Sequence, residues 1–334
     1  MSSPSQAPAL SVILPCEEGF RYIRQTIEAL QQQTICRQIE LVLIVRDALS
    51  DGELAEIDGF HSVRVVVDRG LMGNRARAAG IRAASAPIVA SAEDHCYPEP
   101  RWAASLLAAF ADGWSAVGPS MYNGNPASAL SWVNLLLAFG PWVAPAAAGP
   151  IVQLPWHNTS YQRLLLVEYG DSLGELMDVE GLLQEDLARK GHRFYHAVDA
   201  RVHHLNVSRV SSTITYRLDS SRLFAAYRSR GWSALRRLLY VLAAPLIPIV
   251  RLRRTLPLLR KVEGGPGLHA RVLAVAAVCL IIDSIGETIG YALGSTQRLV
   301  LKVEGFERLR FRHMSRADRR LYDRGRLAPV TVMS

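Results

Sequence analysis

Short apolar runs alternate with helically spaced apolar residues in the first part of the chain. Runs rich in β-branched residues predict buried strands at 10–14, 39–45, 63–67 and 87–90. Apolar residues three and four positions apart predict helices at 19–33 and 76–84. Strands that alternate with helices form parallel sheets covered on both faces, so the pattern predicts a doubly wound α/β domain.

The pattern is less regular beyond residue 120. The apolar stretch at 121–155 is interrupted by prolines and predicts helix and loop that cover the ligand-binding edge of the sheet. A short helix is predicted at 181–190, and two closing strands are predicted at 194–196 and 200–202.

The character of the chain changes after residue 206. Apolar runs at 238–250 and 272–282 are shorter than the roughly 20 residues that span a bilayer, and arginines lie between them. They predict helices that lie in or dip into the membrane interface. Alternatives are a soluble helical lid and a true span at 270–293, which would have to accommodate Asp283 and Glu287. We therefore expect an α/β domain at 1–206 and a membrane-associated helical region at 207–334.

Charge is divided unevenly between these two regions. The formal net charge of +8 consists of about −7 over residues 1–205 and about +15 over residues 206–334. A basic segment of this kind meets an anionic surface. Because its charges are interleaved with apolar runs rather than with stacking aromatics, the expected partner is a membrane surface and not nucleic acid.

The cysteines and the N-terminus bear on the compartment. The four cysteines show no C-x-x-C pair and no disulfide spacing, which predicts a reducing compartment and argues against structural zinc. The first 25 residues show no secretory signal pattern. We expect the protein at the cytoplasmic side of the cell membrane.

Acidic residues follow the strand at 87–90. Ligands of parallel sheets bind beyond the carboxyl ends of the strands, where the sequence places Glu93, Asp94 and His95. Hard divalent cations prefer carboxylate oxygens, and an imidazole can complete the shell. Glu93 and His95 are two positions apart, so both side chains point to one side if the segment is extended. A cation there would neutralise the charge of a diphosphate leaving group; the alternative is a solvated polar strand end.

Five segments resemble, in order, motifs of the family 2 glycosyltransferases with the GT-A fold. They are SVILP at 11–15, ARAAGIRAA at 76–84, EDHCYP at 93–98, LPWHNTSYQR at 154–163 and ARVHH at 200–204. The resemblance implies a GT-A-like doubly wound mixed sheet flanked by helices. It implies transfer of a sugar, with inversion, from a nucleotide-sugar donor to a saccharide or lipid-linked acceptor. Segments at 238–248 and 286–291 resemble an extension of some bacterial members, which implies membrane association.

The resemblance also assigns roles to residues. For the metal, Mg²⁺ or Mn²⁺, the candidate ligands are Glu93, His95 and His204, with Glu93 and His95 replacing both aspartates of the family's Asp-x-Asp motif. Candidates for nucleotide binding are Pro15, Glu18, Asp47, Arg77 and Asp94, and candidates for the acceptor pocket are His157 and Asn158. The replaced aspartates support an alternative function, a catalytically silent GT-A domain that acts as a membrane-bound assembly partner.

The catalytic base is open between several carboxylates. An inverting transfer needs one carboxylate to accept the proton of the acceptor hydroxyl. The family carries this residue at the start of a helix, some residues before a glycine. Counting back from Gly191 favours Glu180, with Asp178 and the pair Glu185 and Asp186 as alternatives.

Overall fold

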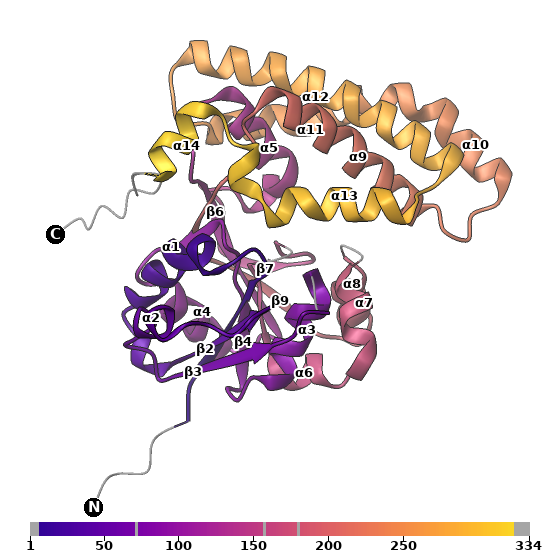
Figure 1. Cartoon of the computed structure of the whole chain (residues 1–334). Coiled ribbons are helices and arrows are strands. Elements are labelled where there is room, and N and C mark those ends of the chain that lie inside the picture. The colour runs from indigo at the N-terminus through magenta and orange to yellow at the C-terminus, as the bar shows by residue number, and fades with distance from the viewer. Residues whose placement is uncertain (1–6, 71–72, 156–157, 179–180, 324–334) are drawn as a thin grey trace, which may run out of the picture. The chain divides into compact units, whose positions relative to one another are not determined.

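The computed structural model describes residues 7–70, 73–155, 158–178 and 181–323 (Figure 1). These residues divide into two compact units. The sheet unit comprises residues up to 122 together with 144–203, and the helical unit comprises 123–143 together with the residues from 204 onward. The chain therefore passes between the units three times, and one passage falls at the last residue of a strand, His204.

The described residues form a nine-stranded mixed sheet in the order β3-β2-β1-β4-β8-β6-β9-β5, with β7 beside β9. The strands are β1 Leu10–Cys16, β2 Ile39–Val45, β3 Ser62–Val67, β4 Ile88–Ser91, β5 Cys96–Pro98, β6 Ala116–Asn123, β7 Gly149–Ile151, β8 Ser160–Gln162 and β9 Phe194–His204. Strands β3, β2, β1 and β4 are parallel, whereas β8 is antiparallel to both β4 and β6. The mixed sheet confirms the fold class.

The first half of the sheet follows the sequence pattern and the second half departs from it. All four strands predicted before residue 92 are present within one or two residues. The prediction of two closing strands at 194–196 and 200–202 is wrong, because β9 runs without a break through both. Its polar residue Asp199 is exposed in an alternating strand and so does not interrupt it.

Helices flank this sheet on both sides (Figure 1). One group consists of α1 Phe20–Gln31, η1 Cys36–Gln38, α2 Asp51–Ala55 and α4 Trp102–Phe110; the other consists of α3 Gly73–Ala83, α6 Arg163–Val167, η3 Gly170–Ser172, α7 Leu173–Asp178 and α8 Leu182–Arg189. The second group shares one apolar core with the sheet, in which Ile13 and Val42 of the strands meet Ile81, Leu173 and Leu183 of the helices.

Helix α3 packs closely on the sheet, and its N-terminus is bonded to the loop after β1. A Cβ atom on Gly80 would lie 2.6 Å from Cγ2 of Ile13 and 2.7 Å from Cδ1 of Ile44, so a larger residue would push α3 away from β1 and β2. At the start of α3, the backbone N–H of Gly73 donates to Oε1 of Glu17 at 2.6 Å. The N-terminus of α3 is thereby held beside the loop that follows β1.

The helical unit is built around one long apolar helix, α12 Pro266–Leu293. The other helices of the unit are α5 Ala129–Phe139, η2 Gly140–Trp142, α9 Val210–Arg228, α10 Ala234–Ala243, η4 Ala244–Leu246, α11 Ile247–Thr255, η5 Leu256–Lys261, α13 Gln297–Arg308, η6 Arg310–His313 and α14 Arg316–Asp323. Helix α12 packs against α5, α9, α10 and α11. By length and composition, α12 is the one described helix that could cross a membrane, although 44% of its apolar window is buried within the protein.

Two glycines bring α9 and α12 into backbone contact. A Cβ atom on Gly286 or Gly290 would collide with the carbonyl oxygens of Leu218 and Arg222, respectively. Because the two helices lie so close, the guanidinium of Arg217 on α9 reaches the carboxylate of Asp283 on α12, with Nε 2.8 Å from Oδ1.

The acidic residues of α12 are compensated inside the helical unit. Asp283 has no exposed surface and Glu287 is 2% exposed. Ser221 also donates to Asp283 at 2.8 Å, and Arg251 of α11 lies 2.7 Å from the carboxylate of Glu287. The apolar run at 272–282 therefore continues through both carboxylates as a single helix that ends at Leu293.

The buried ion pairs make the stability of the helical unit depend on Asp283. We expect Asp283→Ala to lower the free energy of unfolding by about 3–5 kcal/mol, because it leaves the buried guanidinium of Arg217 without its counter-charge. Arg24→Ala is the control: Arg24 pairs with Glu56 at 2.6 Å, but both side chains are exposed, so its loss should lower the free energy of unfolding much less. Denaturant unfolding followed by circular dichroism measures both. Equal effects of the two substitutions would contradict the expectation.

Candidate functional site

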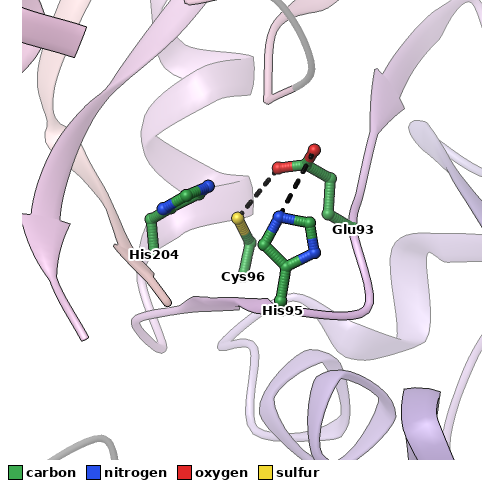
Figure 2. A group of neighbouring side chains, drawn as sticks. All are labelled: Glu93, His95, Cys96 and His204. Atoms are coloured by element: carbon green, nitrogen blue, oxygen red, sulfur yellow. Dashed lines mark hydrogen bonds and ion pairs between the residues drawn. The ribbon is translucent and has the colours of Figure 1, made fainter. Parts of the chain in front are cut away.

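Four side chains with metal-binding atoms converge at one end of the sheet (Figure 2). Glu93 and His95 lie in the turn between β4 and β5, Cys96 is the first residue of β5, and His204 is the last residue of β9. One ligand atom from each residue lies within 4.8 Å of all the others. Strands β5 and β9 are neighbours in the sheet, which brings Cys96 and His204 together across more than a hundred residues of sequence.

The turn that carries Glu93 is pinned by neighbouring elements. The hydroxyl of Thr26 on α1 donates to the carbonyl oxygen of Glu93 at 3.0 Å and lies 3.4 Å from that of Cys96. The backbone N–H of Ala92 donates to the carbonyl of Ile13 at 2.8 Å. Residues 94 and 95 form a turn and are not extended, so the alternation argument for Glu93 and His95 does not apply. Their proximity, 3.8 Å between Nε2 of His95 and Oε1 of Glu93, comes from the turn.

Each member of the group is oriented by a second residue. Nδ1 of His95 lies 2.6 Å from Oδ1 of Asp94, and Nδ1 of His204 lies 2.9 Å from Oδ1 of Asn206. Oε2 of Glu93 accepts a hydrogen bond from the amide of Asn158 at 2.8 Å and one from the Cys96 thiol at 3.0 Å. Asn158, a candidate for acceptor binding, is itself 3% exposed and is placed on the Glu93 carboxylate.

The donor set of this group fits a divalent cation. It offers one carboxylate, two imidazoles and one thiol, all of them 2–4% exposed. Carboxylates, neutral imidazoles and thiolates are the side chains that hold divalent metals in proteins. Binding would release the proton of Cys96, because the thiolate is the ligand form.

Arg77 on α3 is a second notable residue. Its side chain is half-buried, and its Nε is buried with no hydrogen-bond partner among the residues that the structure describes. The only hydrogen bond recorded for its guanidinium within those residues is a long one of 3.4 Å from Nη1 to Asn74. Buried guanidinium N–H groups are normally satisfied. Arg77 therefore has a donor to offer, on the helix whose N-terminus lies beside the loop after β1.

The other candidates for nucleotide binding lie along the same edge of the sheet. Pro15 is in β1 and Glu18 is in the loop after it, and both are half-buried. Asp47 follows β2 and is largely exposed, with its carboxylate paired to the guanidinium of Arg69. Pro15 lies near the carboxyl end of β1, Glu18 follows that end, and Asp47 follows the carboxyl end of β2.

The carboxylates considered as catalytic base are placed only in part. Glu180 and His157 lie outside the described residues; α7 ends at Asp178 and α8 begins at Leu182. Glu185 of α8 is exposed. Asp186 accepts from Lys190 at 2.8 Å and from the hydroxyl of Tyr169 at 2.6 Å. These two hydrogen bonds lower the pKa of the Asp186 carboxyl.

The sequence analysis overlooked Cys96 as a member of the metal group. Cys96 directly follows His95 in the sequence, which could have indicated a ligand. A single cysteine, however, forms no recognisable metal-binding spacing such as C-x-x-C. The role of Asn206 was also missed. It depends on Asn206 lying two residues after His204, where β9 has ended.

Comparison with known proteins gives a family match over part of the chain. Residues 11–164 match the model of the family described as glycosyl transferase family 2, which confirms the resemblance seen in the motifs. A search of curated proteins gives no match. Among solved structures, that of GalNAc-T7 with UDP, GalNAc and Mn²⁺ is 15% identical, with a TM-score of 0.43 over 60% of this chain and 44% of that chain.

A second solved structure is similar over more of its length. The mannosyltransferase PcManGT from Pyrobaculum calidifontis, in complex with GDP-Man and Mn²⁺, is 15% identical, with a TM-score of 0.48 over 84% of this chain and 87% of that chain. The present chain thus spans less than half the length of the GalNAc-T7 chain and most of the length of PcManGT.

Proposed function

We propose, because residues 11–164 belong to glycosyl transferase family 2, that the protein transfers a sugar from a nucleotide diphosphate donor to an acceptor. The family match is the observation that carries this proposal. The metal-binding group and Arg77 support it, because Glu93 follows the parallel strand β4 and Arg77 lies on the helix whose first residue is bonded to the loop after β1.

The donor diphosphate would lie between the start of α3 and the group around Glu93. Helix N-termini attract anions, and Arg77 adds a charged donor to that end of α3. A divalent cation held by Glu93, His95, Cys96 and His204 would neutralise negative charge on the nucleoside diphosphate as it leaves. Pro15, Glu18 and Asp47 would border the nucleoside, and Asp94 would orient His95.

The transfer would proceed with inversion and a single carboxylate base. The base accepts the proton of the acceptor hydroxyl, whose oxygen bonds to the anomeric carbon while the bond from that carbon to the diphosphate breaks. We assign this role to Glu180. Asp186 is a weaker candidate, because a carboxyl with a lowered pKa binds a proton less readily. The acceptor is a saccharide or a lipid-linked saccharide, with His157 and Asn158 near its pocket.

The helical unit would attach the protein to the cytoplasmic membrane surface. Apolar side chains that are 45–68% exposed follow one another along α10, η4, α11 and η5: Leu235, Leu238, Leu239, Leu242, Leu246, Ile249, Val250 and Leu256. Exposed arginines stand among them: Arg236, Arg253, Arg254 and Arg260. Exposed apolar side chains with arginines between them match an interface of acyl chains and anionic headgroups.

Donor binding should depend on Arg77. We expect Arg77→Ala to weaken binding of UDP or GDP, whichever the full chain binds, by about 10- to 100-fold, because it removes a charge-assisted hydrogen bond. Arg82→Ala, an exposed arginine on the same helix, should leave binding unchanged. Titration calorimetry with and without Mn²⁺ measures this. Failure of every nucleotide diphosphate to bind under either condition would favour the silent assembly partner.

Turnover should depend on Glu180. We expect Glu180→Gln to lower the rate of transfer by about 100-fold or more while nucleotide binding stays intact, because only the base is lost. Asp186→Asn should keep most of the activity. A panel of UDP- and GDP-sugars, assayed for release of the nucleoside diphosphate, provides the readout. Full activity of Glu180→Gln together with loss in Asp186→Asn would move the role to Asp186.

Membrane attachment should depend on the exposed leucines of α10. Leu238→Glu combined with Leu242→Glu should reduce binding to vesicles that contain anionic phospholipid by at least about tenfold. Each leucine that enters the apolar layer of the membrane would contribute roughly 1.5–3 kcal/mol to the free energy of binding. Leu301→Glu on α13, where the leucine is 49% exposed, is the control and should bind normally. Vesicle flotation measures the bound fraction. Equal binding of all variants, or equal binding to purely zwitterionic vesicles, would contradict this attachment.

A further inference from the structure

We propose that the cation of this site is of the zinc class, held by four protein ligands: Glu93, His95, Cys96 and His204. The inference rests on the proposed function for the presence of a divalent cation, and it goes beyond it by assigning which cation the ligands select. The assignment follows from the chemistry, the orientation and the burial of these side chains.

The chemistry of the four ligands is that of a zinc site, although the spacing of the cysteines in the sequence argued against structural zinc. Mg²⁺ takes six oxygen ligands and keeps several waters, whereas only Glu93 offers carboxylate oxygen here. Thiolate and imidazole ligands select Zn²⁺ and its neighbours, and four such ligands form a tetrahedral shell, which zinc can expand by a fifth position for a diphosphate oxygen. Cys96 is the residue that makes the set soft. In the family's Asp-x-Asp pattern the neighbouring ligands are carboxylates.

The spacing of the ligand atoms is compatible with this geometry. Zinc bonds of about 2.0–2.3 Å place tetrahedral ligand atoms about 3.3–3.8 Å apart. The four atoms lie within 4.8 Å of one another. The group would contract by about 1 Å around a cation, a change that side-chain rotation can supply. Figure 2 shows the imidazoles, the thiol and the carboxylate facing a common space.

Both histidines are oriented as zinc ligands are. Nδ1 of His95 meets the carboxylate of Asp94, and Nδ1 of His204 meets the amide oxygen of Asn206. Both partners are acceptors, so each imidazole carries its hydrogen on Nδ1 and its lone pair on Nε2. Such a partner on the second ring nitrogen fixes the tautomer and raises the basicity of a metal-binding histidine. Asn158 plays the same part for the carboxylate of Glu93.

The burial of the four ligands also favours a zinc-class cation over Mg²⁺. The four ligands are 2–4% exposed, which leaves little room for the waters that Mg²⁺ retains. A zinc-class cation instead exchanges its water for four protein ligands. The site therefore favours a cation that is readily dehydrated.

Cobalt substitution tests the thiolate ligand directly. The full chain is stripped with a chelator and reloaded with Co²⁺, which replaces zinc in tetrahedral sites and reports on its ligands by absorption. We expect about one equivalent of Co²⁺, intense visible bands and a near-ultraviolet thiolate charge-transfer band. Cys96→Ser should abolish the near-ultraviolet band. Cys36→Ser, a half-buried cysteine in η1 outside the group, should keep it. Absence of the band from the unaltered chain would overturn the proposal.

Competition between metals tests selectivity. Most nitrogen and sulfur sites bind Zn²⁺ more tightly than Mn²⁺, so the informative quantity is the change in the ratio of the two dissociation constants. Cys96→Asp should reduce the preference for Zn²⁺ over Mn²⁺ at least about tenfold, because a hard ligand replaces a soft one. Asp94→Asn, which leaves all four ligands in place, should weaken Zn²⁺ binding by about 10- to 100-fold. If a Cys96→Asp variant with a native circular dichroism spectrum shows an unchanged ratio of the Zn²⁺ and Mn²⁺ dissociation constants, the assignment of a zinc-class cation is refuted.

The same preparations separate this inference from the proposed function. Zinc bound with the thiolate signature, but no nucleotide diphosphate bound, would refute the transferase and leave the metal assignment standing. Sugar transfer by a chain that holds Mg²⁺ or Mn²⁺ and never shows the thiolate signature would refute the metal assignment and leave the transferase standing.

Discussion

Burial of the Glu93 carboxylate is the constraint on which the arrangement of the site depends. A carboxylate that is 3% exposed must receive donors from the protein, because water cannot supply them. Asn158 donates from the segment before β8, Cys96 from β5, and His95 stands close within the turn. The hydroxyl of Thr26 on α1 donates a hydrogen bond to the backbone carbonyl of Glu93 and so holds the turn. Two elements distant in sequence, α1 and the segment before β8, are thus fixed to one residue, Glu93, and the end of β9 completes the group.

Local patterns in the sequence account for the parallel half of the sheet and for its ligand-binding edge. Runs such as that of β2 need no partner to be recognised, since their length and β-branched residues identify them. The pairing of Asp186 with Lys190 was likewise readable from helical spacing. The features that could not be predicted from the sequence depend on contacts between residues far apart in the chain. Cys96 joins His204 in the group only because β5 lies beside β9, and no periodicity encodes which strands pair.

In the helical unit, too, contacts between distant residues could not be predicted from the sequence. Asp283 and Glu287 look like interruptions of an apolar run because hydropathy considers each residue without its partner. Arg217 stands on a different helix and reaches Asp283 only where Gly286 and Gly290 let the two backbones touch. The partners of the two α12 carboxylates could not be identified from the sequence, because they lie on other helices, whereas the apolar residues of α10 and α11 needed no neighbour to be recognised.

The insertion of α5 has a consequence for how the chain is made. Helix α5 lies between strands of the sheet unit in sequence, yet it packs on α12, which begins more than a hundred residues later. During synthesis α5, with its buried residues Trp132, Leu135 and Leu136, leaves the ribosome long before α12, against which the helix packs. The nascent sheet unit therefore carries an uncovered apolar helix until the chain is nearly complete. A fragment that stops at residue 206 would keep that surface permanently.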